Sequence, residues 1–479
     1  MAGEGSTLDD ASSKPGTRDW VVKIKGSIRQ HSLMRENTVK RNPRKTTRRV
    51  VRDVRELNTK AYCASEFSFG LIDRSPLDVL KRRADRCKVA MATALLKDLD
   101  KTEDYWEELC SKAVPDPEEI QEHYDEHECN AFSLLELQSV LTLDAVFLAG
   151  YLGSWQSNFT THFPSLKSAL ESIVDNQTNY QILQDLIKVE NQIPLILIRN
   201  VLAILMERVG GHVDQLVGET MHKMCSKVVT TFSSPLPGYD PKHLDAATKG
   251  VSFVECHNFL DCVYTTLTHK LRGRMKQSKV AGFTDAIPGL LPSVTELRKA
   301  GIEFRGCKGF GDIEFKARFL KGTLYLPTLH IYDNTESLWR NLVAHEQQLN
   351  DGADFGSHPD FINYIDFMDS LIDSENDVMV LRSGKYPTIA YNSLGTDAAV
   401  ANLFNTLLQY TILIPSEKWS KLRCEIYDFY NKGQRQMYLE FKEAYFGKPW
   451  LTISVVAATI ALIMTILTAA YTMALYYHP

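Results

Sequence analysis

The chain has 479 residues, of which 44% are hydrophobic and 24% are charged, and its formal net charge is −5. This length allows two or three domains with a large core, and the composition is ordinary for a globular protein. The slightly acidic balance excludes a protein that coats nucleic acid along its whole length, because such binding needs an excess of Lys and Arg.

Residues 1–48 are predicted to form a basic, disordered arm. Thirteen Lys or Arg residues lie between Arg18 and Arg55. A solvated arm is the common outcome of such a run, and nuclear targeting, nucleic-acid contact and anionic-lipid contact are the alternatives. Lipid contact leads these alternatives, because the other end of the chain resembles a membrane segment.

The body, residues 49–417, is predicted to be mainly helical, because its apolar residues recur three or four positions apart. The helices are expected, in chain order, at 76–101, 134–152, 181–206, from Glu336 onward, 360–382 and 396–412. Pro194 marks a start, break or kink in the third of them. The second and third are expected to be buried helices of the body, since a charge at mid-membrane depth costs at least ~2.5 kcal/mol and both contain charges.

One segment has a different period. Residues 312–333 alternate apolar and polar positions around Lys321-Gly322, which predicts an antiparallel β-hairpin. The expected fold class is therefore mainly α (α+β), with a helical body, one small antiparallel hairpin or sheet and a single C-terminal transmembrane helix. Residues 418–449 are expected to form a stem helix that leads into this anchor.

Residues 450–477 contain no charge and exceed the roughly 20 residues that a helix needs to cross a bilayer. Trp450 and Tyr477 resemble the aromatic residues found at membrane interfaces. The first forty residues hold no apolar run of the secretory type, and Lys442 and Lys448 precede the anchor. The positive-inside rule then predicts a tail anchor with the body in the cytosol, in an unspecified membrane.

Two features bear on this topology and on assembly. Asn158 and Asn176 begin glycosylation sequons, which matter only if the body is lumenal; the cytosolic topology predicts that they stay unmodified. Small residues recur every four positions in the anchor, at Ala457, Ala461, Thr465 and Ala469. Small residues at this spacing let membrane helices approach closely, which suggests a homo-oligomer.

The Glu190-Asn191-Gln192 block lies between apolar residues and is expected on a buried helix. A buried carboxylate beside two amides suits either a catalytic constellation or a satisfied polar network, and the network is favoured. His345 and Glu346 are further catalytic candidates for an enzyme whose site is assembled from distant residues.

Other motifs are weaker. His123 and His127 have the spacing of a helical metal pair, but they stand in an acidic run that favours a solvated loop. Gly306, Gly309 and Gly311 precede the predicted hairpin, so a turn is favoured over a phosphate loop. No catalytic residue, metal, cofactor or small-molecule substrate is assigned.

Blocks spread along the chain resemble, in order, those of the plant family DUF247. They include VENQIPLILIRNVL at 189–202, TESLWRNLVAHEQ at 335–347, FMDSLIDSENDV at 367–378 and the closing anchor at 446–471. The segment after Tyr62, CASEFSFGLIDRS, matches the family pattern only loosely. The polar residues within or near these blocks are Asp144, Glu190, Asn191, Gln192, Pro194, Glu336, Asn341, Glu346, Asp369, Asp373 and Asp377.

The resemblance implies a plant protein without established catalytic residues. Some members of the family are associated with pollen-side self-incompatibility in grasses. The resemblance therefore implies a membrane protein that acts in recognition or signalling through protein partners, without catalysis; an uncharacterised hydrolase or transferase is the alternative.

Overall fold

A computed structural model of the protein describes residues 47–431, with gaps, and residues 449–477. The gaps are 73, 75–81, 117, 119, 121–122, 211, 239–247, 249, 273–290, 310–311, 319–320 and 351–359. Nearly all of the basic arm expected at 1–48 lies outside the described residues, as do Leu77 and Leu80 of the first expected helix.

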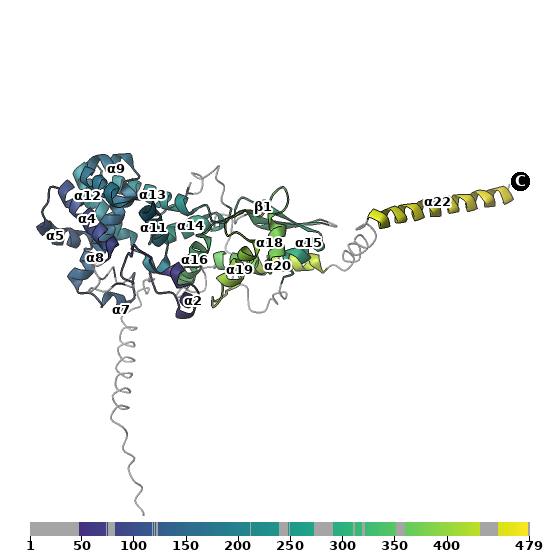
Figure 1. The fold of residues 1–479 in the computed structure, drawn as a ribbon, viewed down its shortest axis with the longest axis horizontal. Coiled ribbons are helices and arrows are strands. Elements are labelled where there is room, and N and C mark those ends of the chain that lie inside the picture. Colours follow the sequence, from purple (N-terminus) through teal and green to yellow (C-terminus); the bar gives the residue numbers. More distant parts are fainter. Residues whose placement is uncertain are drawn as a thin grey trace, which may run out of the picture. The chain divides into compact units, whose positions relative to one another are not determined.

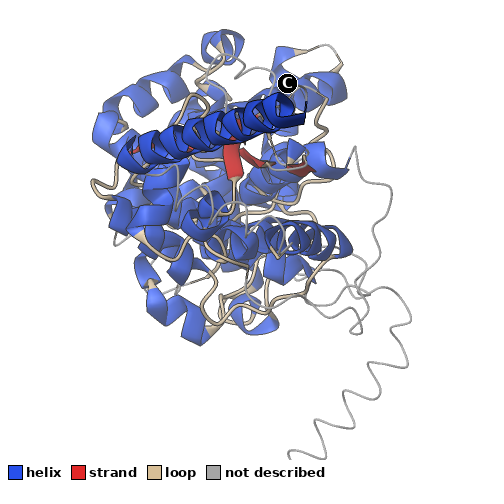
Figure 2. Ribbon diagram, turned by 90° about the vertical axis from the view of Figure 1, so that its right-hand side faces the viewer, coloured by secondary structure: helices blue, strands red, loops and turns tan. Residues whose placement is uncertain are grey.

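The described elements are mainly helices (Figures 1 and 2). The first part of the chain contains α2 (Arg52–Leu57), α3 (Thr59–Tyr62), α4 (Arg83–Asp98), η2 (Glu103–Tyr105), α5 (Trp106–Ala113), α7 (Glu126–Cys129), α8 (Leu134–Gly153), α9 (Ser157–His162), α10 (Pro164–Ile173), α11 (Asn176–Leu186), η3 (Val189–Asn191), α12 (Leu195–Val209) and α13 (Val213–Phe232). The remainder contains α14 (Phe259–Arg272), α15 (Val294–Lys299), β1 (Ile302–Cys307), β2 (Glu314–Ala317), β3 (Gly322–Pro327), β4 (Leu329–Ile331), α16 (Thr335–Asn350), α17 (Asp360–Asp369), α18 (Glu375–Arg382), β5 (Ile389–Asn392), α19 (Asp397–Leu407), α20 (Glu417–Tyr430) and α22 (Pro449–Tyr477).

Helix α8 forms the centre of the first group of helices. It begins at a capping box, in which Ser133 and Glu136 exchange side-chain and backbone hydrogen bonds. Beyond its first turns almost every residue is buried, because α4, α5 and α12 pack around it (Figure 1). A helix covered on all sides is apolar all round, and this explains why residues 134–152 show little amphipathic pattern.

Helix α16 forms the centre of the second group. It packs against α3, α14, α17 and α19, and its Trp339 side chain is fully buried. The Trp339 indole donates a hydrogen bond of 2.9 Å to the Pro235 carbonyl, so its polar atom is satisfied inside the core.

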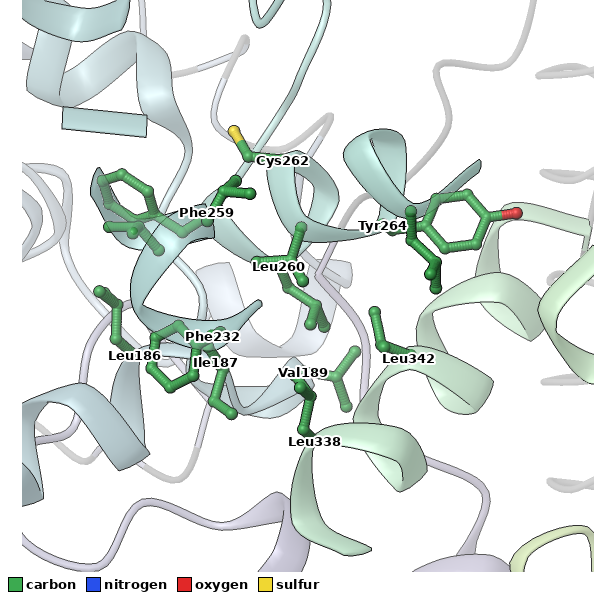
Figure 3. Packing of buried hydrophobic residues seen from close by; sticks show 14 of the residues in the cluster. Leu186, Ile187, Val189, Phe232, Phe259, Leu260, Cys262, Tyr264, Leu338 and Leu342 are labelled. Carbon is green, nitrogen blue, oxygen red and sulfur yellow. The ribbon is translucent and has the colours of Figure 1, made fainter. Parts of the chain in front are cut away.

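Apolar side chains from both groups meet in a continuous core (Figure 3). Val189 of η3 and Leu260 of α14 lie beside Leu338 and Leu342 of α16 in this view. All four are almost completely buried. The polar block that follows Val189 is therefore attached to the core at the meeting point of three segments that are distant in sequence.

The predicted hairpin is confirmed by the antiparallel pairing of β2 with β3. Two further pairings are parallel: β1 pairs with β3, which gives the order β1-β3-β2, and β4 pairs with β5 (red in Figure 2). The sequence pattern did not predict them, since Leu329 and its partner Ile389 are far apart in the chain and no turn joins them.

The prediction of one continuous helix at 181–206 is wrong. Helix α11 ends at Leu186, η3 forms one 3₁₀ turn, and α12 starts after Pro194. Gln192 is extended, with φ −102° and ψ 147°. The Glu190-Asn191-Gln192 block is thus not on an α-helix. Pro194 disfavours helical geometry at Ile193 and cannot donate its own N–H, so α12 begins only after it. The segment expected at 360–382 is likewise divided, into α17 and α18.

Three helical segments are long and apolar enough to cross a membrane. Two of them are Leu134–Gly153, which is α8, and Val189–Val209, which joins η3 to α12, and 72% of the apolar stretch of each is buried inside the body, as expected of core segments. The third, Ile453–Met473 in α22, has a mean hydropathy of 2.3 and is 0% buried. The C-terminal helix is therefore a candidate membrane span.

Helix α20 covers the first part of the segment expected to be a stem. Trp419, Leu422, Ile426 and Phe429 along it are buried. Phe429 meets Phe315 of β2 with ring centroids 5.1 Å apart. This part of the segment belongs to the packed body.

Candidate functional site

The candidate site is a buried polar network that holds residues 47–72, here called the strap, against the rest of the body. Asn191 provides the central contacts: its side-chain oxygen accepts from the Phe69 N–H at 2.6 Å, and its amide nitrogen donates to the Phe67 and Asp185 carbonyls. A buried backbone group without a hydrogen-bond partner costs free energy. The Asn191 side chain therefore supplies the hydrogen bonds that a neighbouring strand would otherwise give to the strap backbone.

The Gln192 side chain bonds to backbone groups outside the strap. Its side-chain nitrogen donates to the Leu186 and Lys188 carbonyls at 2.8 and 2.7 Å. Its side-chain oxygen accepts from the Leu260 N–H at the start of α14. One amide therefore satisfies the backbone at the end of α11 and the beginning of α14.

Glu190 binds the first part of the strap. One carboxylate oxygen accepts from the Val50 N–H at 2.8 Å and the other from the Arg55 guanidinium at 2.9 Å. Arg55 also donates to the Cys63 sulfur at 2.9 Å. The hydrogen bonds that a carboxylate accepts from a guanidinium and a backbone N–H are charge-assisted, and they fix the orientation of the carboxylate.

Asp185, at the end of α11, holds the middle of the strap. Its carboxylate accepts from the backbone N–H groups of Ser65, Glu66 and Phe67 at 2.8–2.9 Å. Lys188 lies 2.9 Å from the same carboxylate. Sequence reasoning missed Asp185, because an aspartate on an amphipathic helix carries no signal that its side chain will be fully buried.

Asp144 holds the end of the strap through a cluster of charges. It accepts from the Gly70 N–H, from the Arg74 guanidinium at 3.0 and 3.1 Å and from the Lys88 ammonium at 2.8 Å. Burial, followed by the nearby Arg74 charge, lowers the pKa of Lys88 to about 8. Asp85 approaches both cations, so two acids and two bases lie together.

Gly70 allows the strap to pass this cluster. Its φ is +71°, and a Cβ atom placed there would lie 2.4 Å from the Gln192 carbonyl oxygen and 2.5 Å from the Tyr124 hydroxyl. Tyr124 itself donates to that carbonyl at 2.9 Å. Both the left-handed backbone and the close approach require glycine.

The second helical group reaches the strap through α16. The Asn341 side chain accepts from the Val189 N–H at 2.7 Å and donates to the Ala61 carbonyl at 2.8 Å. Glu336, one turn earlier, accepts from the Asn58 side chain at 3.0 Å. The strap is therefore bonded to both helical groups.

The model of the family described as "plant protein of unknown function", DUF247, matches residues 48–464. The chain belongs to this family. It is also 27% identical to UPF0481 protein At3g47200 of Arabidopsis thaliana over 183 residues, 38% of this chain and 37% of that protein. A second Arabidopsis thaliana relative, putative UPF0481 protein At3g02645, is 26% identical over 176 residues, 36% of this chain and 31% of that protein.

The chain thus spans about a third of the length of these curated relatives. No solved structure matches it. The matched range of the DUF247 model begins in the strap and ends inside α22, so it includes every segment that the polar network joins.

The other polar residues noted from the DUF247 resemblance hold other parts of the body. Glu346 accepts from the Tyr264 hydroxyl and from the Phe361 and Ile362 N–H groups at the start of α17. Burial raises the pKa of Glu346 to about 7. The neighbouring His345 lies 3.2 Å from an Asp261 carboxylate oxygen.

Asp377 caps α18 through the Ser374 N–H and also accepts from the Thr295 N–H. Burial raises its pKa, but these hydrogen bonds outweigh burial and leave it lowered. Burial, with the charges of Asp366 and Asp373, raises the pKa of Asp369 to about 6. Asp373 is exposed, and the charges of Asp377 and Glu296 add to burial in raising its pKa.

The spacing of His123 and His127 does not produce a shared helical face. Helix α7 begins at Glu126, after His123. The His123 ring lies 6.0 Å from that of His257, whereas His127 is exposed and contacts Glu128. Among the described residues there is no group of three or more His, Cys, Asp or Glu side chains that could hold a metal ion.

The glycine cluster lies at the end of a strand and in the turn after it. Gly306 is in β1 and Gly309 follows it, while Gly311 is outside the described residues. All nine cysteines are free thiols.

Proposed function

We propose that this DUF247 protein is a membrane-anchored interaction component, which presents its helical body to protein partners without catalysing a reaction. The observation that carries the proposal is α22: 29 residues without a charge, whose Ile453–Met473 window has no buried part. An apolar surface of this length is unfavourable in water and suits a bilayer.

The hydrogen bonding of the catalytic candidates supports a role without catalysis. The Glu190 carboxylate is engaged by Val50 and Arg55, and the Glu346 carboxylate by Tyr264 and two backbone N–H groups. Buried acids bonded in this way orient the backbone rather than face a substrate.

An exposed apolar loop between α19 and α20 supports the interaction part of the proposal. Tyr410, Ile412 and Leu413 are 68%, 71% and 49% exposed. Tyr410 and Ile412 line one groove of about 210 Å³ together with Val51, which is 66% exposed. A partner protein with an apolar face is the occupant that we propose, because clustered apolar surface of this kind marks interaction sites.

The finer parts of the proposal concern topology and context. The body faces the cytosol, because Lys442 and Lys448 precede α22 and positive residues stay on the cytosolic side. The basic arm contacts anionic lipid near the anchor, and the recognition belongs to signalling of the self-incompatibility type. These parts rest on the sequence and the family resemblance.

Proximity labelling in the native tissue tests the function. Three forms are compared: the full-length protein, a chain truncated before Pro449, and a chain with α22 replaced by an unrelated apolar span. We expect the chain with the replaced anchor to label the same partners as the full-length protein, and the truncated chain to lose this labelling. Identical labelling by the truncated chain would mean that the membrane is incidental.

The apolar loop is tested in the same assay. Tyr410→Ser with Ile412→Ser should reduce labelling of the partners without lowering the melting temperature. Tyr180→Ser, at a 57% exposed tyrosine on α11, is the matched control. Partner labelling that survives the double substitution would remove the loop from the proposal.

A glycosylation reporter tests topology. A sequon added after Pro479 should be modified in microsomes, while Asn158 and Asn176 remain unmodified. A mobility shift abolished by Asn158→Gln or Asn176→Gln would place the body in the lumen and overturn the cytosolic orientation.

A further inference from the structure

A pocket of about 630 Å³ opens between α12, α13 and the segment that precedes α14. Leu195 and Ile196 of α12, Met221 of α13 and Phe253 provide its apolar walls. Sites for small molecules commonly have volumes of 300–1,000 Å³ and apolar walls with a few polar groups. The size and walls of this pocket are of that kind.

The polar side chains of the lining include one guanidinium, three imidazoles and one carboxylate. Arg199 on α12 carries a permanent positive charge and forms no ion pair with a residue in the described part of the chain. His257 and His123 also line the pocket, with their rings 6.0 Å apart. Glu255 supplies one carboxylate to the same lining.

The state of His123 follows from its surroundings. Burial, followed by the nearby His257, lowers the pKa of His123 to about 4. Its imidazole is therefore neutral at physiological pH and keeps both a donor and an acceptor nitrogen. The positive charge of this lining that does not depend on pH comes from Arg199.

Gly218 keeps one wall of the pocket open. It lies inside α13, where glycine is less favourable than alanine by roughly 0.5–1 kcal/mol. Its φ lies outside the left-handed region, so the backbone does not require glycine. A Cβ atom at this position would meet nothing within 4 Å. The missing side chain therefore leaves space in the pocket.

We propose that this pocket binds a small amphipathic anion: an apolar or aromatic body with one carboxylate. The body lies between the apolar walls, and the carboxylate faces the Arg199 guanidinium. A charged ligand group opposite a charged donor gives a hydrogen bond about twice as strong as a neutral pair. This proposal is independent of the proposed partner binding.

The test uses the full-length protein in nanodiscs of uncharged lipid, with 2-naphthoate as the probe and equilibrium dialysis as the measurement. Empty nanodiscs give the background, and 2-naphthalenemethanol is the uncharged analogue. The wild-type protein should bind one 2-naphthoate per chain, at least tenfold more tightly than the alcohol. Binding no greater than that of empty nanodiscs would overturn the proposal.

Two variants localise the binding. Gly218→Leu adds a side chain at the pocket wall, where a Cβ atom meets nothing within 4 Å, and it should abolish binding while leaving the melting temperature unchanged or higher. Arg199→Gln should weaken 2-naphthoate at least tenfold and leave the alcohol unchanged. Arg208→Gln, near the end of the same helix and paired with Asp100, is the control that should bind as the wild type does. Wild-type affinity in both pocket variants would exclude this pocket as the binding site.

Discussion

The Lys88 ammonium lies 2.8 Å from a carboxylate oxygen of Asp144, and neither side chain has any exposed surface. The two residues come from neighbouring core helices, α4 and α8, and their charges are shared with Arg74 and Asp85. A charge left without its partner in this buried position would also have no water to solvate it. Substitution of either residue should therefore destabilise the packing of α4 on α8.

Asp144→Asn should lower the free energy of unfolding by about 3–5 kcal/mol, since it leaves Lys88 and Arg74 buried without their principal counter-charge. Urea denaturation followed by tryptophan fluorescence measures the change. Glu56→Gln removes the acid of an exposed pair with Arg52 and should change stability little. Equal stability of Asp144→Asn and the wild type would show that the buried charges are not coupled to folding.

Gly70→Ala should be far more damaging than Gly210→Ala. Both glycines have a positive φ, +71° and +76°, and the ψ of Gly210 is 172°, so alanine is strained at each position by about 1–3 kcal/mol. Only at Gly70 does the new Cβ meet backbone, 2.4 Å from the Gln192 carbonyl oxygen; at Gly210 nothing lies within 4 Å. The melting temperatures of the two variants, measured by thermal unfolding, separate the effect of backbone strain, which both share, from that of the steric clash at Gly70. A similar loss in both would mean that the strap can move away.

Glu190→Gln should loosen the strap, because the amide no longer pairs with the Arg55 charge. The expected cost is about 1.5–3 kcal/mol, the range for hydrogen bonds to charged groups. Hydrogen exchange measured by mass spectrometry should show faster exchange near Val50 and Arg55. Helix α18, which Asp377 caps, serves as the internal reference. Uniform acceleration throughout the body would indicate global destabilisation instead of local release.

Stability should depend on pH through Glu346. Burial raises its pKa in the folded protein to about 7, above the ordinary value of 4.5 for a glutamate side chain. The folded state then retains a proton that the unfolded state releases, so stability falls as pH rises from 4.5 to 7, by at most about 1.4 kcal/mol per pH unit.

Glu346→Gln should remove this slope. His123 acts in the opposite direction, because its pKa is lowered to about 4 and stability from this group is lost as pH falls from about 6.5 to 4. The difference between wild type and variant, measured by urea denaturation at pH 5 and pH 7, therefore isolates Glu346. A difference that is the same at both pH values would contradict the prediction.

The anchor should drive self-association if its small residues pack against a second copy. Thr465 donates to the Ala461 carbonyl at 2.7 Å within its own helix, which leaves this face with few projecting groups. Ala461→Leu with Thr465→Leu should abolish the signal of the full-length chain in a membrane two-hybrid assay. Ile463→Leu, off the stripe, is the control. An unchanged signal in the double variant would exclude this face.

Much of the helical body could be predicted from the chain alone, because each long helix has its own apolar period. Residues 134–152 were expected as a helix and form α8, and α19 occupies residues 397–407 of the helix expected at 396–412. The β2–β3 pair was also predictable, since both strands lie next to one turn. The two parallel pairings were not, because the chain passes through β2 between β1 and β3, and through α16, α17 and α18 between β4 and β5.

The polar site illustrates the same division. The composition around Glu190, Asn191 and Gln192 indicated that polar groups are buried there, and a satisfied network was the favoured interpretation. The chain alone did not indicate that Glu190 and Asn191 bond to backbone groups of the strap, more than a hundred residues earlier. Asp185 and Lys88 gave no local signal at all.

By itself, the sequence determined the family, the helical class and a C-terminal segment apolar enough for a bilayer, since these depend on composition and short-range periodicity. Only the tertiary structure decided what the polar residues do. Hydrogen bonds and ion pairs act over about 3 Å in space, whatever the separation along the chain, so the strap, the buried Lys88–Asp144 pair and the open pocket beside Gly218 exist only once the helices have packed.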